Sequence, residues 1–350
     1  MSEDSGTPKR ARPRSVALLR SLAGTLLLPL KGLFRLMNRR QREMLVKIPG
    51  ALAVYRLISP WLVSARSEGG MACAEVNGLK MYLDPAEEAS HAGAFLWGAY
   101  EPATTAVVMA VVREGDTVVD VGAHWGYFAL LAASLCGQRG RVVAFEPHPR
   151  NFALLKKNLE ANGLTQVEAV QKAVSNRAGS TELFQAQSTA SHSVVSVQHD
   201  STSGGGSLNE SMVVDTVALD DFFPPGSPEP RLIKIDIEGA EPLALAGMRC
   251  LLERSPSLAL IVEFNPAYLD AKGATDFLAQ LTHCGFDVAI IDDDRRRLAL
   301  GSKAAVLAQL LERKTTCNLL AARDPSLFER LLHQPEGSGK HSGRRERVRL

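Results

Sequence analysis

Between residues 117 and 322, short apolar runs alternate with segments of helical character, and this alternation constrains the fold more than any other feature. The apolar runs are DTVVDVG, RVVAFEP, VEAVQKAV, RLIKIDIEG, SLALIVEFN, FDVAIID and CNLLAAR. The segments between them include WGYFALLAASL, RNFALLKKNLEANG and AEPLALAGMRCLLE. Helices between apolar strands are typical of parallel βαβ units. The sequence therefore predicts an α/β protein with a doubly wound, Rossmann-like sheet.

Two further elements are predicted before this alternation, and one interruption is predicted within it. Ala74–Asp84 has an Asn-Gly turn between short alternating runs, which is typical of a β-hairpin. A helix is predicted over Pro102–Val112, with the proline in its first turn. Thr181–Ser211 contains STSGGGSLNES and is predicted to be a loop or a flexible insertion.

The charge of the chain is unevenly distributed. Residues 1–50 carry a net charge of +8 and residues 336–350 a net charge of +3, whereas the whole chain carries +2, so the remainder carries −9. Basic ends on an acidic body indicate contact with an anionic partner, or solvated tails. We predict four parts: a disordered basic tail (1–14), a helical N-terminal extension (15–66), a globular domain (67–325, core 101–322) and a disordered basic tail (334–350).

The N-terminal extension has two interpretations. Its apolar segment Ser21–Leu30 is too short to cross a bilayer as a helix. Val16–Met37 is either a helix that covers the globular domain or an amphipathic helix that lies on an anionic membrane surface. The five cysteines are far apart in the sequence, which indicates reduced thiols. We expect a cytoplasmic protein, peripheral to the membrane if this helix binds lipid.

A carboxylate and a glycine turn follow the first strand, in the order Asp120-Val-Gly122-Ala-His-Trp-Gly126. Ligands of open α/β sheets bind at the carboxyl ends of the strands, and glycine lets the backbone approach a ligand closely. The pattern lacks the third glycine of a dinucleotide fingerprint, and its carboxylate precedes the first glycine. A carboxylate suits a ligand that carries an ammonium and a sulfonium, so the turn predicts S-adenosylmethionine.

The ends of the next two strands complete this predicted cofactor site. Glu146 ends the second strand, 26 residues after Asp120, where an acid can accept hydrogen bonds from both ribose hydroxyls. Pro147 provides an apolar wall for the adenine, and Ala173 and Val174 are expected on its other face. The alternatives are a tight turn with no ligand and an exposed loop acid.

Six motifs resemble the FkbM-type methyltransferases. They are VVDVGAHWGYFALLAA, VVAFEPHPRNFALLKKNLEANG, QKAVSNRAG, TVALDDFF, IKIDIEGAEPLALAGM and LIVEFNP, of which KIDIEGAE is the most specific. The resemblance covers Glu101 to Ala322. It implies a class I methyltransferase fold, S-adenosylmethionine as cofactor, and methylation of hydroxyl oxygens in sugars, polyketides or similar molecules. One departure is His124, where family members usually have asparagine.

The candidate residues fall into two groups. The candidate catalytic residues are Asp236, Glu238, Glu263 and His124. The candidate cofactor-binding residues are Glu101, Asp120, Gly122, Ala123, His124, Gly126, Glu146, Pro147, Ala173 and Val174. A hydroxyl nucleophile needs a proton acceptor or a metal, and Asp236 at the end of the fourth strand is the first choice for the base. Asp236, Glu263 and Asn265 form an alternative Mg²⁺ site of oxygen ligands.

Several of these residues also have structural interpretations. Glu238 and Glu241 are acids favoured in a first helical turn, and Lys234 can form a structural ion pair. Tyr100, together with Glu101, is expected over the methionine end of the cofactor. His192, in the insertion, is an alternative substrate contact.

The sequence favours an O-methyltransferase that acts on a small molecule, a sugar or a lipid-linked glycan. The alternative from another class is an inactive methyltransferase-fold protein that binds a membrane or a partner. An NAD-dependent oxidoreductase has weaker support, because the dinucleotide fingerprint is incomplete. Nucleic-acid binding is not expected, since the body is acidic and has no aromatic-basic interleaving.

Overall fold

The computed structural model describes residues 71–84, 100–184, 211–269, 271–293, 295–313 and 315–332. The predicted basic tails, the N-terminal extension 15–66 and His192 lie outside these residues, so they stay predictions. None of the helices in the described part of the chain combines the length and the hydrophobicity that a bilayer-spanning helix needs. All five cysteines are free thiols.

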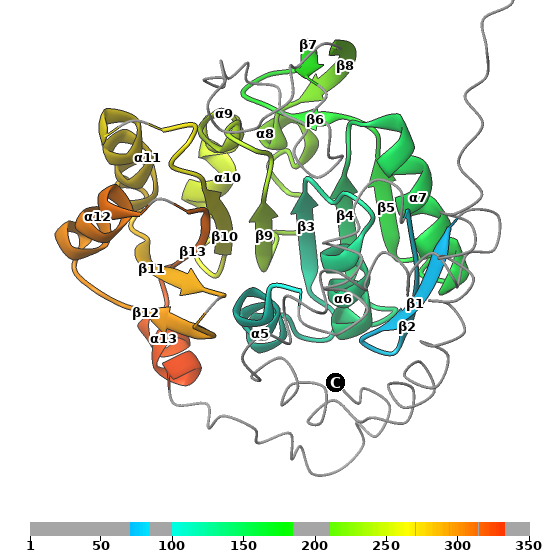
Figure 1. Ribbon diagram of the computed structural model, residues 1–350, viewed down its shortest axis with the longest axis horizontal. Coiled ribbons are helices and arrows are strands. Elements are labelled where there is room, and N and C mark those ends of the chain that lie inside the picture. Colours follow the sequence, from blue (N-terminus) through cyan, green and yellow to red (C-terminus); the bar gives the residue numbers. More distant parts are fainter. Residues whose placement is uncertain are drawn as a thin grey trace, which may run out of the picture.

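The centre of the molecule is an eight-stranded sheet with the order β12-β11-β13-β10-β9-β3-β4-β5 (Figure 1). Its strands are β3 (Thr117–Val121), β4 (Arg141–Phe145), β5 (Val167–Val170), β9 (Leu232–Ile235), β10 (Ala259–Phe264), β11 (Asp287–Asp292), β12 (Arg297–Ala299) and β13 (Cys317–Ala322). The predicted doubly wound sheet of class I methyltransferase type is confirmed. Strands β5, β4, β3, β9 and β10 are parallel, whereas β13 is antiparallel to both of its neighbours, β10 and β11.

Helices cover both faces of this sheet. One face packs against α5 (Pro102–Val111), α6 (Tyr127–Cys136), α7 (Pro149–Ala161) and α13 (Pro325–Leu332). The other face packs against α8 (Leu219–Phe222), α9 (Glu241–Ala246), α10 (Arg249–Arg254), α11 (Ala271–His283) and α12 (Lys303–Glu312). Because the central strands are covered on both sides, β3, β9 and β13 are buried along their whole length. Asp120, Lys234 and Asn318 are therefore polar residues inside apolar strands.

A second sheet, of three strands, lies at the carboxyl ends of β3 and β4 (Figure 1). It contains β6 (Ala173–Val174), β8 (Ser211–Val217) and β7 (Gly179–Phe184). The predicted single strand VEAVQKAV is therefore two strands in different sheets. The chain turns after β5, where the Lys172 amide donates to the Val170 carbonyl. The predicted loop Thr181–Ser211 is wrong at both ends, which pair as β7 and β8; residues 185–210 lie outside the described residues.

Two local predictions differ in how well they hold. The hairpin is confirmed as β1 (Ala72–Val76) and β2 (Leu79–Leu83), whose Asn-Gly turn has positive φ angles at both residues. The predicted helix AEPLALAGMRCLLE is two helices, α9 and α10, that break at Gly247. A Cβ atom at Gly247 would lie 2.1 Å from the Ser175 carbonyl oxygen, so the close contact of this break with the chain after β6 requires glycine.

Candidate functional site

A cavity of about 560 Å³ opens at the carboxyl ends of β3, β4 and β9, where the strand order reverses. This volume includes the open solvent at the mouth of the cavity. Eight of the predicted site residues line it: Gly122, His124, Glu146, Pro147, Ala173, Val174, Asp236 and Glu238. Five predicted residues do not line it: Glu101, Asp120, Ala123, Gly126 and Glu263. The predicted set therefore divides into the cavity wall and residues beside it.

The glycine turn after β3 is shaped by contacts within the protein. A Cβ atom at Gly122, which has a φ of 82°, would lie 1.9 Å from the Asp236 carbonyl oxygen. A Cβ atom at Gly126 would lie 2.6 Å from a methyl carbon of Leu155. Gly122 therefore brings the turn against the end of β9 at the cavity wall, whereas Gly126 brings it against α7.

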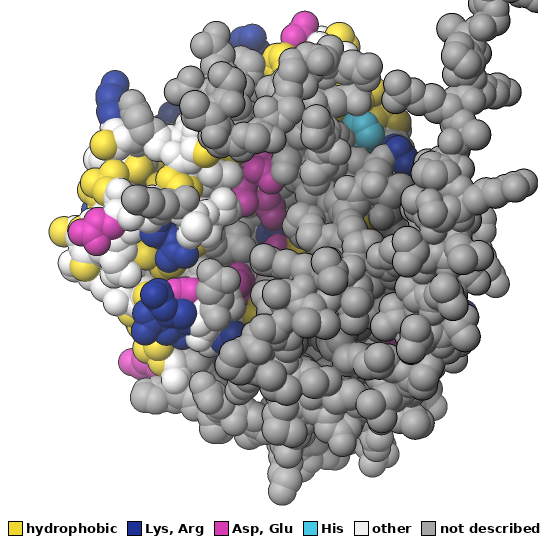
Figure 2. Space-filling model, in the orientation of Figure 1, with side chains coloured by type: hydrophobic (Ala, Val, Ile, Leu, Met, Phe, Trp, Pro, Cys, Tyr) yellow, Lys and Arg dark blue, Asp and Glu magenta, His cyan; other side chains and the backbone are white. Residues whose placement is uncertain are grey.

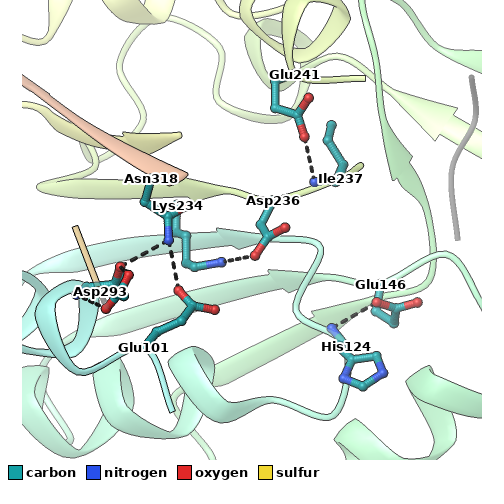
Figure 3. Close-up of polar contacts among 10 residues, drawn as sticks. Glu101, His124, Glu146, Lys234, Asp236, Ile237, Glu241, Asp293 and Asn318 are labelled. Carbon is teal, nitrogen blue, oxygen red and sulfur yellow. Dashed lines mark hydrogen bonds and ion pairs between the residues drawn. The ribbon is translucent and has the colours of Figure 1, made fainter. Parts of the chain in front are cut away.

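Glu146 is fixed by backbone groups at the end of β4. Its Oε2 accepts a hydrogen bond of 2.9 Å from the His124 amide (Figure 3), and its Oε1 accepts one of 2.9 Å from the His148 amide. The carboxyl group is 5% exposed, and burial raises its pKa to about 7 although these bonds lower it. Each carboxylate oxygen keeps a further lone pair. Glu146 can therefore accept additional hydrogen bonds in a fixed direction.

Seven cavity residues were not predicted: Val121, Phe145, Asn151, Lys172, Leu183, Ile237 and Ala240. Asn151 is 2% exposed and hydrogen-bonds the Glu146 side chain, which lowers the pKa of Glu146. The sequence contained a signal for Asn151, because a polar residue on the buried face of a predicted helix indicates a specific contact. No such signal existed for Leu183, because it lies on β7 within the predicted loop.

A buried lysine joins the acids on the other side of the cavity. Lys234, on β9, is 3% exposed and its Nζ lies 2.6 Å from Asp236 Oδ2 (Figure 3). The ammonium also lies 4.6 Å from the centre of the Phe128 ring. Burial alone would lower the pKa of Lys234, but Asp236, Glu101 and Asp120 outweigh it and raise that pKa above its ordinary value. Lys234 therefore remains charged and does not act as a base.

Asp120 lies directly opposite Lys234 on the paired strands β3 and β9. It is 2% exposed, and both of its carboxylate oxygens lack a hydrogen-bond partner among the described residues. Burial raises the pKa of Asp120 to about 6 and Asp236 adds to this, whereas Lys234 and the Ala129 backbone amide lower it. The amide does not make a well-formed hydrogen bond, and a buried carboxylate that lacks such bonds is costly and requires an explanation.

Three carboxylates gather at the ends of β9 and β10. Oxygens of Asp236, Glu238 and Glu263 lie within 4.8 Å of one another. Glu263 Oε2 is buried and has no partner within the described ranges. Burial and mutual repulsion raise the pKa of Glu238 to about 8 and that of Glu263 well above its usual range. Figure 2 shows acidic side chains gathered near the centre of this face of the molecule.

Asn265, the third predicted Mg²⁺ ligand, has other contacts. Its Oδ1 accepts a hydrogen bond of 3.0 Å from the Ala267 amide, and its Nδ2 lies 3.5 Å from Glu238 Oε2. It therefore contacts the cluster through Glu238, and Glu238 takes its place among the grouped oxygens.

Glu241 shapes the loop that carries Glu238. The Glu241 carboxylate accepts hydrogen bonds of 2.9 Å from the Ile237 amide and 3.0 Å from the Gly239 amide (Figure 3). Glu238 has a φ of 53°, and a Cβ atom at Gly239 would lie 2.6 Å from the Tyr268 ring. Glu241 is thus an acid in the first turn of α9 that holds the loop after β9 in its conformation.

Glu101 approaches this group from the start of α5. Its Oε2 accepts a hydrogen bond of 2.9 Å from Asn318 Nδ2 on β13 (Figure 3). Burial raises the pKa of Glu101 to about 7, although Lys234 attracts the charged form. Asn318 was not predicted. The signal that could have indicated it is a single amide side chain in the otherwise apolar strand CNLLAA. The cavity therefore has Glu146 on one side and Asp236 and Glu238 on another, and Lys234 pairs with Asp236 without lining the cavity itself.

The comparisons with known proteins agree with this geometry. Residues 120–288 match the family model described as the Methyltransferase FkbM domain. The chain is 28% identical over 169 residues to the hexuronic acid methyltransferase AglP of Haloferax volcanii, covering 48% of this chain and 63% of that protein. It is 37% identical over 59 residues to protein-L-isoaspartate O-methyltransferase 1 of Archaeoglobus fulgidus, covering 17% and 27% of the two chains.

Among solved structures, the chain is similar to methyltransferase FkbM from Methylobacillus flagellatus, at 14% identity and a TM-score of 0.36. That match covers 78% of this chain and 60% of the other, and it is too loose to carry an argument.

Proposed function

We propose that this chain, a member of the FkbM methyltransferase family, is an S-adenosylmethionine-dependent methyltransferase that modifies a hydroxyl oxygen of a sugar, a small molecule or a lipid-linked glycan. The observation that carries the proposal is the cavity at the reversal of strand order, with Glu146 on one side and Asp236 on the other. The family match supports the methyl transfer.

The cofactor would lie across the ends of β3 and β4. Glu146, held by two backbone amides, would accept hydrogen bonds from the ribose hydroxyls. Pro147, Ala173 and Val174 would contact the adenine. The buried oxygens of Asp120 have no partner among the described residues, which supports a role for Asp120 near the cationic methionine end. Gly122 would let the turn approach that end closely.

Asp236 is the proposed base. It lines the cavity at the end of β9, and Lys234 holds one of its oxygens. The cofactor would supply the methyl group, and its sulfur would keep the electron pair of the broken bond. Asp236 would orient the acceptor hydroxyl and accept its proton. Glu238, Glu263 and His124 remain the alternative catalytic groups.

The nature of the acceptor rests on a relative. The hexuronic acid methyltransferase of Haloferax volcanii has, by its name, a sugar acid as substrate, and this supports a sugar acceptor here. The cytoplasm remains the proposed location.

The decisive experiment is calorimetric titration of the full chain with S-adenosylmethionine, followed by transfer of a labelled methyl group to a panel of sugars and glycolipids. We expect saturable cofactor binding and label on a hydroxyl oxygen. Absence of binding would instead support the alternative of an inactive protein that binds a membrane or a partner.

A divalent cation is a second proposal for the same acids, supported by the three grouped carboxylates. Asp236, Glu238 and Glu263 would supply oxygen ligands, which Mg²⁺ prefers. If the cation is needed, EDTA abolishes methyl transfer, Mg²⁺ restores it, and Mg²⁺ raises the thermal midpoint of the protein. EDTA-resistant activity would leave Asp236 as a metal-free base.

Membrane contact is proposed for Val16–Met37, on the basis of sequence alone. Binding to anionic vesicles would fall steeply with salt, because exposed charges are screened beyond about 8 Å at physiological ionic strength. Equal pelleting of the full chain and of a truncated protein that starts at Ser67 would count against this proposal.

A further inference from the structure

Glu101 has a backbone conformation that is unfavourable for an L-residue. It is the residue before the first turn of α5, with φ 38° and ψ 64°, in the left-handed region. Such a conformation persists only where the surroundings fix it, and it often occurs at functional sites. A residue in this position usually caps the helix with its side chain, but the Glu101 side chain makes no such hydrogen bond.

Asp293 caps the helix instead. Its Oδ1 accepts hydrogen bonds of 2.7 Å from the Ala103 amide and 3.0 Å from the Thr104 amide. These are the second and third amides of the helix, which an N-cap side chain ordinarily satisfies. The cap therefore comes from a residue 190 positions away, after β11. As a result, the Glu101 carboxylate can extend toward Lys234 and Asn318 (Figure 3).

The Asn318 amide is oriented by the same group of residues. The Thr104 hydroxyl donates a hydrogen bond of 2.7 Å to Asp293 Oδ2, so its oxygen accepts one of 3.0 Å from Asn318 Nδ2. That amide nitrogen donates its other hydrogen to Glu101 Oε2. Asn318 is 7% exposed in a central strand, which leaves it little freedom to rotate.

We infer that Asn318 is a positioning residue that holds the Glu101 carboxylate where it meets the ammonium of the methionine end of the cofactor. Asp293 and Thr104 hold Asn318 in turn. The inference rests on the proposed function and extends it to two residues, Asn318 and Asp293, that lie outside the matched range 120–288.

The electrostatics support this role. Glu101 is surrounded by Asp236 and Asp293, which disfavour its charged form, while Lys234 favours it. A hydrogen bond donated to a carboxylate also favours the charged form. The hydrogen bonds from Asn318 and with Tyr100 therefore both favour the charged form of Glu101, which an ammonium partner requires.

The test compares two ligands that share adenosine but differ at the other end. S-adenosylhomocysteine carries the ammonium, whereas 5′-methylthioadenosine lacks it. Asn318→Leu keeps the side-chain size and removes the donor. We expect calorimetry to show about tenfold to a hundredfold weaker binding of S-adenosylhomocysteine, the change that corresponds to a lost hydrogen bond to a charged group. Binding of 5′-methylthioadenosine should not change.

Two further variants separate positioning from general damage. Asn162→Leu is the matched control, because Asn162 bonds the backbone of the β1–β2 hairpin at the far end of α7; it should not discriminate between the ligands. If Asn318→Leu does not fold, Asn318→Ala removes the same donor and should give the same discrimination. Glu101→Gln should weaken S-adenosylhomocysteine binding less in Asn318→Leu than in wild type, because Asn318 acts on the ligand through Glu101.

The possible outcomes are distinct. Wild-type binding of both ligands with selective loss in Asn318→Leu supports the inference. Equal loss for both ligands, or no loss, would overturn it and leave the proposed function intact. A wild-type protein that binds neither ligand would overturn the proposed function itself and the inference with it.

Discussion

The two sides of the cavity are built from different groups. On the side of Glu146, the carboxylate is held by the backbone amides of His124 and His148, within a largely apolar wall. On the side of Asp236, the carboxylates of Asp236, Glu238 and Glu263 lie close together, and Lys234 pairs with Asp236. Backbone donors keep their position and charge whatever the pH, although the pKa of the Glu146 carboxyl group itself is raised to about 7. The grouped carboxylates on the other side require a proton or a cation. The first side is therefore suited to recognition, and the second to chemistry.

The largest expected effect is on the acidic side. If Asp236 is the base, Asp236→Asn should lower turnover by about 10²–10⁴-fold, the usual contribution of general base catalysis, and change cofactor affinity far less. Steady-state kinetics and calorimetry on the same preparation measure both quantities. Asp276→Asn on the exposed surface of α11 is the control. Near-normal turnover of Asp236→Asn would make Asp236 a structural acid, with His124 or Glu238 next to be tested.

The second effect concerns Glu146. Its substitution should change cofactor affinity more than turnover, which is the reverse of the effect expected for Asp236→Asn. Glu146→Ala should weaken S-adenosylmethionine binding by about 1.5–3 kcal/mol, the scale of a hydrogen bond to a charged group. Turnover at saturating cofactor should change less than affinity. Glu168→Ala, on the neighbouring strand β5 in an exposed ion pair with Arg141, is the matched control. If folded Glu146→Ala binds S-adenosylmethionine as tightly as wild type, Glu146 does not contact the cofactor. The proposed difference between the two sides of the cavity would then be wrong.

The smallest effect concerns the pH dependence of stability without ligand. Burial, with repulsion from Asp236 and Glu241, raises the pKa of Glu238 from 4.5 to about 8. A carboxyl group whose pKa is raised on folding stabilises the folded state below its unfolded pKa, and this stabilisation is lost as pH rises through about 8. Glu238→Gln should therefore gain thermal stability relative to wild type between pH 5 and pH 8.5. The expected gain is about 2–4 °C, the shift that corresponds to about 1 kcal/mol in a domain of 150–250 residues.

The matched control for this experiment is Glu168→Gln, since Glu168 lies on the surface. Its difference in thermal midpoint from wild type should be the same at both pH values. If the difference in thermal midpoint between Glu238→Gln and wild type is also the same at both pH values, ionisation of Glu238 does not destabilise the folded protein.

The sequence predicted those parts of the site that follow directly from strand order. Glu146 and Asp236 come at the ends of the second and fourth apolar runs, and the carboxyl ends of parallel strands meet at one edge of a sheet. The contact of Asn318 with Glu101 was out of reach, because it joins residues 217 positions apart. It also depends on the antiparallel entry of β13 between β10 and β11, which no local pattern in CNLLAA indicates.

Other differences have local causes that a pattern of apolar residues does not contain. Ala173 and Val174 continue an apolar run after β5, but they pair with β8 in the second sheet. Their partner strand, β8 (Ser211–Val217), directly follows a stretch rich in serine and glycine that was predicted to be a loop. Gly126 looks like a ligand contact in sequence, whereas its side of the turn faces Leu155.

The central place of β13 has a consequence for how the protein folds. During synthesis the N-terminal part of a chain emerges first, yet here the strand between β10 and β11 is the last of the sheet to be made. Until residue 322 is available, β10 and β11 each have an unpaired edge, and exposed edges of this kind promote association with other chains. Pairing across such long sequence separations also slows folding. The nascent protein therefore has a period of vulnerability to aggregation that ends only when its final strand inserts.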